Sequence, residues 1–317
     1  MLPKNWGEPM GAPAIFEKQI EIKLLHPAST LESRIQVCFA SQNVFDLAER
    51  LPMIHNLRLA KLFWTLTSFL ALFAALGGVI FKDIYLNLYP EDFLSGALPQ
   101  DVLTIMVCLL LFWLIRKTKE NDVKLQVIIL GLLGSFFYLY GIFTIERVYN
   151  GLYLLYLATF AASFWSIIYS LSGFKSESCS TMTLDRRMLK TTAFISILIA
   201  IIFTVLWIFA LIPLMKAHNR IEFLYSIYIL DLCFVMPAFI MVAVMSLRGM
   251  ALGILMAPAI MILGFFVIFP LGLNELAKLF NGIDAGYGPM VVSFLFSFLM
   301  LTIAILQLRM IRFDASA

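Results

Sequence analysis

Residues 224–248 read LYSIYILDLCFVMPAFIMVAVMSLR. The stretch is apolar and long enough to cross a bilayer as a helix, which takes about 20 residues. Asp231 lies inside it, and Pro237 follows about two turns later. A carboxylate within a spanning helix costs about 2.5–3.5 kcal/mol on insertion scales, so it normally faces a protein interior or a wet cavity. The stretch therefore predicts a membrane span with a polar inner face.

The composition extends this interpretation to most of the chain. Hydrophobic residues make up 62% of the sequence and charged residues 14%, against about 45–50% and about 25% in soluble domains. We expect an all-α fold, a polytopic membrane helix bundle of about eight transmembrane helices. The expected spans are 61–81, 101–116, 124–146, 150–172, 191–214, 224–247, 250–273 and 289–311.

The chain before the first span differs in character. Between 31 and 51, apolar residues recur at near-helical spacing with charged residues between them, which predicts an amphipathic helix on the membrane surface. We therefore divide the chain into a cytoplasmic N-terminal segment, 1–60, and a transmembrane bundle, 61–317. The opening residues show no signal peptide, because they lack an apolar core region.

The basic residues predict the orientation of the bundle. With the N-terminus inside, fourteen Lys and Arg residues from Arg50 onward fall on the inner side and five on the outer side. This distribution follows the positive-inside rule. We expect a multipass protein of the plasma (inner) membrane with both termini cytoplasmic and a comparatively acidic outer face. The net charge of +3 is small and predicts no nucleic-acid partner.

The order of the spans is compatible with an internal duplication. The span that contains Asp101 and the span that contains Asp231 both end in basic residues, and each is followed by a span with small residues near its start. Spans one to four would then match spans five to eight as a parallel 4+4 repeat about an axis along the membrane normal. The alternative is the chance alignment of apolar segments.

The duplication would place several polar side chains at equivalent positions. Asp101 and Asp231, together with Glu146 and Glu275, would line an outward-facing acidic cavity. The hydroxyl groups of Tyr228, one turn before Asp231, and Tyr156 could hydrogen-bond to the carboxylates inside it. A purely structural alternative is that Asp101 caps the start of its helix. For the tyrosines it is aromatic packing near the interface.

Several kinds of chemistry have no support in the sequence. The four cysteines form no CxxC pair, and none of the three histidines lies in an apolar segment, so we expect no metal or haem site. No HExxH, Walker or GxSxG motif is present. We expect no cofactor and no catalytic residue; an enzyme would have to work through Asp and Glu alone.

Short motifs also carry a resemblance. They are Tyr138-Leu139-Tyr140, the run from Tyr149 to Tyr156, Asp231-Leu232 with Pro237, Gly253 with Ala257-Pro258, and Gln100-Asp101. Through them, roughly residues 60–310 resemble a family of uncharacterised bacterial multipass membrane proteins. The family has no established activity, so the resemblance implies a bacterial membrane setting and nothing about the reaction or substrate.

Three functions follow as hypotheses. The first is a transporter or channel-like protein with Asp231 at the base of the acidic cavity. The second is a non-catalytic membrane subunit or scaffold, with partner subunits besides the lipid bilayer, since most spans carry few polar residues. The third is a membrane enzyme that uses Asp and Glu. A wet cavity that reaches Asp231 would favour the first, and a dry core around a single hydrogen bond to it would favour the second.

Overall fold

The structure, a computed structural model, describes residue 54 and residues 56–89, 91–173, 182–183, 185–218, 221 and 224–313. All its helices belong to one compact unit, Leu47–Ala317. The amphipathic helix expected at 31–51 lies outside the described residues, so it stays a prediction. The boundary expected at residue 60 is likewise untested.

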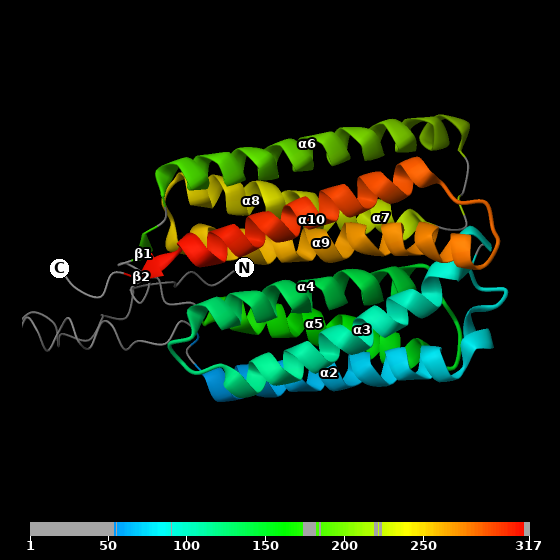
Figure 1. Cartoon of the computed structure of the whole chain (residues 1–317), viewed down its shortest axis with the longest axis horizontal. Coiled ribbons are helices and arrows are strands. Elements are labelled where there is room, and N and C mark those ends of the chain that lie inside the picture. The colour runs from blue at the N-terminus through cyan, green and yellow to red at the C-terminus, as the bar shows by residue number, and fades with distance from the viewer. Residues whose placement is uncertain are drawn as a thin grey trace, which may run out of the picture. The chain divides into compact units, whose positions relative to one another are not determined.

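Helices make up nearly all of the described chain (Figure 1). They are α2 (Leu57–Ile80), η1 (Lys82–Tyr85), α3 (Glu91–Lys117), α4 (Val123–Ile145), α5 (Tyr153–Ser172), α6 (Arg186–Ala217), α7 (Tyr225–Leu230), the π-helical turn η3 (Asp231–Val235), α8 (Met236–Leu247), α9 (Ala251–Phe280) and α10 (Tyr287–Met310). Helices α7, η3 and α8 follow one another without a break and form one span. Two short strands, β1 (Met182–Thr183) and β2 (Arg312–Phe313), pair antiparallel.

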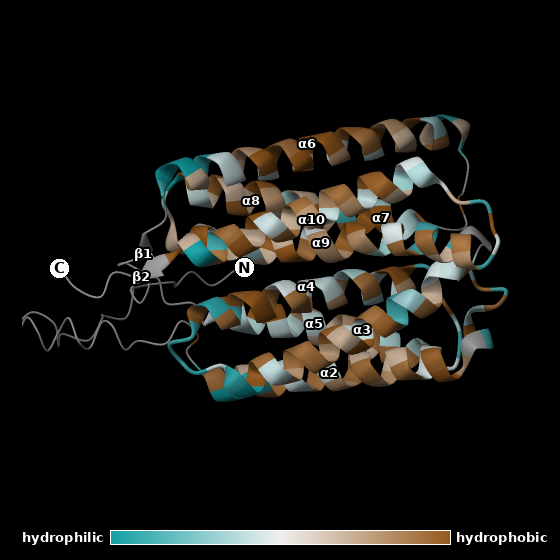
Figure 2. Cartoon of the chain, viewed as in Figure 1, coloured by the Kyte–Doolittle hydropathy of each residue, from teal (hydrophilic) through white to brown (hydrophobic). Residues whose placement is uncertain are grey.

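Eight helices in the described part are long and apolar enough to cross a membrane. The predicted class, an all-α polytopic bundle, is therefore confirmed. Figure 2 shows the apolar residues along the lengths of the helices and the hydrophilic residues toward their ends. Capping side chains mark two of these ends: the Asn56 carboxamide oxygen accepts from the Leu59 N–H at 3.1 Å, and the Asp185 carboxylate from the Met188 N–H at 3.3 Å.

The central helices of the bundle are α4 and α9, the most buried of the eight spans. They pack against each other, and α5 packs on α4 as α10 packs on α9. Gly131 permits this contact, because a Cβ atom there would lie 2.8 Å from the Ile262 Cβ and 2.9 Å from the Ala259 carbonyl oxygen. Small residues at helix crossings of this kind let backbones approach closely within a membrane.

The second span begins earlier than the sequence suggested. We expected residues 101–116, which is short for a membrane-spanning helix. Helix α3 instead begins at Glu91 and continues through Pro99, as membrane helices can when neighbouring groups satisfy the backbone. Asp101 therefore lies inside a helix and does not cap one, so the structural alternative given for this carboxylate was wrong.

The packing follows the expected repeat only in part. Helices α4 and α9, the third and seventh spans, pack together as a symmetric pair would, and α2 packs on α3 as α6 packs on α8. However, α2 also packs on α5, whereas α6 and α10 make no comparable contact. Gly131, near the start of α4, faces α9, whereas Gly253, near the start of α9, lies against Met245 and Ser246 of α8. The repeat therefore stays a prediction.

Sidedness can be tested by cysteine accessibility. We call the two ends of the bundle the Glu146 end and the Arg116 end, after the residues that lie there. In a cysteine-free background in native membranes, single cysteines at Asn87 and Asp284 should react with an impermeant maleimide. Cysteines at Glu120 and Arg248 should react only after permeabilisation, because the positive-inside rule places the Arg116 end in the cytoplasm. The reverse pattern would contradict the expected orientation.

Candidate functional site

Asp231 is held inside the bundle by an aromatic donor. Its side chain is only 3% exposed, and Oδ2 accepts a hydrogen bond of 2.7 Å from the indole Nε1 of Trp207 on α6. Tyr138 of α4 lies beside the same carboxylate. The second oxygen, Oδ1, is buried and has no hydrogen-bond partner among the described residues. The carboxylate is thus half satisfied.

The helix around Asp231 is not regular. Asp231 starts the π-helical turn η3. The Asp231 carbonyl oxygen accepts a hydrogen bond from the Met236 N–H, five residues on. Pro237 explains this geometry. A proline has no N–H to donate to the Cys233 carbonyl oxygen, and in a regular α-helix its ring would collide with the Cys233 carbonyl group. The wider turn relieves the collision, and π-helical turns of this kind are frequent at functional sites.

The partner of Asp231 is not the one that the sequence suggested. We expected Tyr228 to donate to the carboxylate, but the donor is Trp207, and the Tyr228 ring instead packs edge-on against Trp207 with ring centroids 5.3 Å apart. Sequence reasoning missed Trp207 because it weighed only hydroxyl and amide side chains in the fifth span. The available signal was the indole N–H of Trp207 in the span that precedes the one with Asp231.

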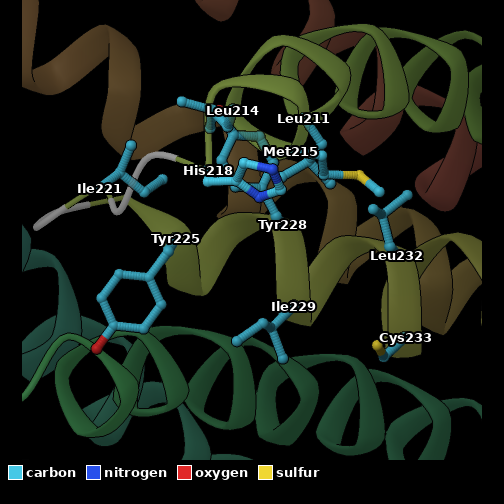
Figure 3. A pocket seen from close by; sticks show the side chains of 10 residues that line it. All are labelled: Leu211, Leu214, Met215, His218, Ile221, Tyr225, Tyr228, Ile229, Leu232 and Cys233. Carbon is cyan, nitrogen blue, oxygen red and sulfur yellow. The ribbon is translucent and has the colours of Figure 1, made fainter.

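A groove lies next to this site, between the last turns of α6 and the α7–η3 segment (Figure 3). Its volume is about 700 Å³, and it is open along one side. The groove is lined by Tyr228, three residues before Asp231, and by Leu232, directly after it. Asp231 itself is not part of the lining. The paired rings of Trp207 and Tyr228 connect the groove wall to the buried carboxylate.

Asp101 belongs to a separate polar cluster in the first half of the chain. It is 3% exposed, and its Oδ2 accepts a hydrogen bond of 2.9 Å from the Tyr85 hydroxyl of η1. Burial, followed by the nearby Asp101 charge, raises the pKa of Tyr85 well above its ordinary value, so the phenol stays a neutral donor. Gly78 leaves the space for this contact, because a Cβ there would lie 2.0 Å from Oδ2.

Tyr156 joins the Asp101 cluster and not Asp231. Its side chain is fully buried, and its hydroxyl accepts a hydrogen bond of 3.1 Å from Asn150 and lies beside the Tyr85 hydroxyl. Tyr140 closes the cluster with a hydrogen bond of 2.9 Å to the Ala71 carbonyl oxygen of α2. The connected side chains Asp101, Tyr85, Tyr156 and Asn150 thus come from α3, η1, α5 and the loop before it.

Glu146 joins the two halves of the chain at one end of the bundle. It follows α4, and its Oε1 accepts a hydrogen bond of 2.9 Å from the Ser226 backbone N–H in the first turn of α7. The Tyr225 hydroxyl donates to the Ile145 carbonyl oxygen beside it, and the Arg147 guanidinium lies 5.7 Å from the Tyr225 ring centroid. A carboxylate at this position offsets the exposed amides and the dipole of α7.

The environment of Glu146 disfavours its charge. It is 7% exposed, and Oε2 is buried without a hydrogen-bond partner among the described residues. Burial raises the pKa of Glu146 above its ordinary value, with the Ser226 hydrogen bonds and the Arg147 charge offsetting part of the effect.

Glu275 has a local role in the connection between α9 and α10. It forms a salt bridge of 2.8 Å with Lys278, and its Oε2 accepts a hydrogen bond of 2.8 Å from the Gly286 N–H, just before α10. This carboxylate therefore fixes a loop at the start of a helix, much as Glu146 does for α7.

The structure does not bring the four carboxylates into one cavity. Side chains two positions apart on a helix point about 200° apart, and Tyr138 faces Asp231 while Tyr140 faces the Asp101 cluster. Helix α4 therefore separates the two aspartates. Glu146 and Glu275 each hold the start of a different helix. Sequence reasoning found all four residues but gave them a shared site, and the four have separate partners.

Comparison with known proteins gives no further guide to the site. No protein-family model, no curated protein and no solved structure matches this chain. The resemblance to an uncharacterised bacterial family therefore stays a prediction. Within the described ranges, no group of three or more His, Cys, Asp or Glu side chains could hold a metal ion.

The bond between Trp207 and Asp231 can be measured with a double-mutant cycle. Trp207→Phe removes the donor, Asp231→Leu removes the acceptor, and the pair should show a coupling energy of about 0.6–1.7 kcal/mol, as interhelical hydrogen bonds in membranes do. Asp231→Asn should keep the fold, since it retains an acceptor oxygen, whereas Asp231→Leu should lower the thermal midpoint in detergent by leaving the indole unpaired. Trp113→Phe, at an exposed position on α3, is the control. If the stability losses of Trp207→Phe and Asp231→Leu simply added in the double mutant, the hydrogen bond would be ruled out.

The raised pKa of Glu146 predicts a pH dependence of stability. Folding favours the protonated form, so this residue contributes most to the free energy of unfolding below its ordinary pKa of about 4.3, and the contribution falls as the pH rises through the raised value. Glu146→Gln should therefore gain thermal stability relative to wild type between pH 5 and pH 8. Glu275→Gln is the control and should show no such gain, because Lys278 pairs with that carboxylate. If the difference in thermal stability between Glu146→Gln and wild type did not change with pH, the raised pKa of Glu146 would be contradicted.

Proposed function

We propose that the protein is a membrane transporter coupled to protons or small cations, with Asp231 as the coupling carboxylate. The observation that carries the proposal is the half-satisfied state of this residue, with Oδ2 on Trp207 and Oδ1 buried without a partner in the described part of the chain. Ionisable residues inside membrane spans commonly mark ion pathways and proton relays.

The chemistry of a buried, half-satisfied carboxylate favours exchange of a positive charge. An isolated anion in a medium of low dielectric constant is expensive, so it is stabilised by a proton or a bound cation. The Trp207 indole offers only one hydrogen bond to Asp231. Oδ1 is therefore the position at which a proton or cation would be taken up and released.

Two features of the span support a moving part at this site. The π-helical turn and Pro237 interrupt the regular hydrogen-bond ladder, so the helix can bend there at little further cost. Tyr228 lines the groove and packs on Trp207, whose indole donates to Asp231. A shift of these rings would open a path from the groove to Oδ1.

A second candidate is a non-catalytic membrane subunit. It is favoured by the separation of Asp101 and Asp231 into two clusters, each with an aromatic donor, an arrangement that also serves as interhelical packing. The membrane-enzyme hypothesis gains no support, because the two aspartates do not form an acid–base pair.

Charge movement in liposomes separates the two candidates. Purified wild type, Asp231→Asn and Asp101→Asn are reconstituted with a pH-sensitive dye inside and a potassium-diffusion potential across the membrane, with and without sodium. Wild type should admit protons, with or without dependence on sodium. Asp231→Asn should lose this flux, and Asp101→Asn, the matched buried-carboxylate control, should retain it.

Two outcomes would overturn the proposal. Flux in Asp231→Asn equal to wild type would remove this residue from the pathway. Absence of flux in the wild type, together with a stoichiometric partner that co-purifies from native membranes, would establish the subunit hypothesis in its place.

A further inference from the structure

The groove between α6 and α7 changes in character along its length. Its sides come from the last turns of α6 and from the α7–η3 segment (Figure 3). Toward η3 the lining is apolar, with Leu211, Leu232 and Cys233. Near the connection between α6 and α7 it includes the imidazole of His218 and the ring of Tyr225. The groove therefore has an apolar part within the span and a polar part at the Glu146 end.

Among the described residues, basic side chains lie close to the polar part. Arg147 lies over the Tyr225 ring, and Lys216 lies in the last turn of α6, next to the groove residue Met215. His218 is exposed at the same place. The neighbouring Glu146 side chain is 7% exposed and accepts the Ser226 N–H, and it offsets part of the Arg147 charge.

The Tyr225 side chain is fixed in position. Its hydroxyl donates to the Ile145 carbonyl oxygen of α4. Figure 3 shows the Tyr225 hydroxyl oxygen turned away from the other groove residues. The ring thus presents a face, held from both the α4 and α7 sides, between the basic side chains and the apolar part of the groove.

We propose that this groove binds an anionic phospholipid from the surrounding leaflet. One acyl chain would lie along Leu211, Leu232 and Cys233, and the phosphate would lie among Arg147, Lys216 and His218. The volume of about 700 Å³ is within the roughly 300–1,000 Å³ of ligand pockets. Basic side chains at the interface favour anionic headgroups. The proposal rests on the groove residues and not on ion coupling at Asp231, although the path proposed above would begin in the same groove.

Lipid-specific stabilisation tests the site. Delipidated protein in neutral detergent is titrated with dioleoyl phosphatidylglycerol, with dioleoyl phosphatidylcholine, or with glycerol phosphate alone. Only phosphatidylglycerol should raise the thermal midpoint strongly and remain bound in native mass spectrometry, since binding to the folded state stabilises it. Arg147→Gln and His218→Gln should each weaken its apparent affinity, about fivefold for a full charge.

Filling the groove provides the second test. Ile229→Trp places a large ring at a groove position that is 41% exposed, and it should abolish the specific effect of phosphatidylglycerol. Leu154→Trp, at a position on α5 that is 78% exposed, is the matched control and should behave as wild type. If Ile229→Trp does not fold, alkylation of Cys233 by a short maleimide, with the other cysteines replaced by serine, gives the same information. Phosphatidylglycerol should slow it and phosphatidylcholine should not.

Four results would overturn the proposal, and the first three concern the two lipids. They are equal stabilisation by both lipids, retention of the phosphatidylglycerol effect in Ile229→Trp, and a Cys233 alkylation rate that neither lipid changes. Stabilisation by glycerol phosphate alone would show an anion site that needs no acyl chain, and it would equally contradict a lipid site.

Discussion

A polar group inside a lipid-embedded bundle must find its partner within the protein, because the hydrocarbon region offers no water. Much of this structure can be understood from that constraint. Asp101 is held by Tyr85, and Asp231 by Trp207. In both cases the donor is an aromatic side chain, which adds apolar surface to the packing while its single polar atom binds the carboxylate. Each half of the chain therefore pairs its own buried aspartate, and α4 lies between the two hydrogen-bonded clusters.

The backbone adapts to these buried groups. Gly78 leaves room for the Asp101 carboxylate against α2, and the π-helical turn at Asp231 accommodates Pro237. Both are local departures from the most stable helix, since glycine costs about 1 kcal/mol relative to alanine in a helix and π-helical turns are rare. The first departure completes a hydrogen-bonded cluster. The second leaves Oδ1 of Asp231 without a partner in the described chain. Asp231, unlike Asp101, therefore has an oxygen at which a proton or cation could bind.

Carboxylates at the Glu146 end of the bundle have a different task. Glu146 holds the first turn of α7, and Glu275 holds the residue before α10. Each accepts a backbone N–H that a helix start leaves free. Glu146 also fixes α7 against α4, with Tyr225 completing the contact. The α7 end that forms one side of the groove is thereby attached to the central helix of the bundle.

The amino-acid sequence by itself determined the class of the protein. Eight apolar spans follow from hydropathy alone, because a helix that crosses a bilayer must be apolar over most of its length, and the same reasoning identified Asp231 as a buried carboxylate. The tertiary structure decided the partners. Trp207, Tyr85 and Gly78 are unremarkable in the sequence, and only the packing of α6 on η3 and of α2 on α3 brings them to the aspartates. Whether two buried carboxylates share a cavity depends on which face of α4 each one meets. Hydrophobic periodicity does not specify that choice in a helix that is apolar on all sides.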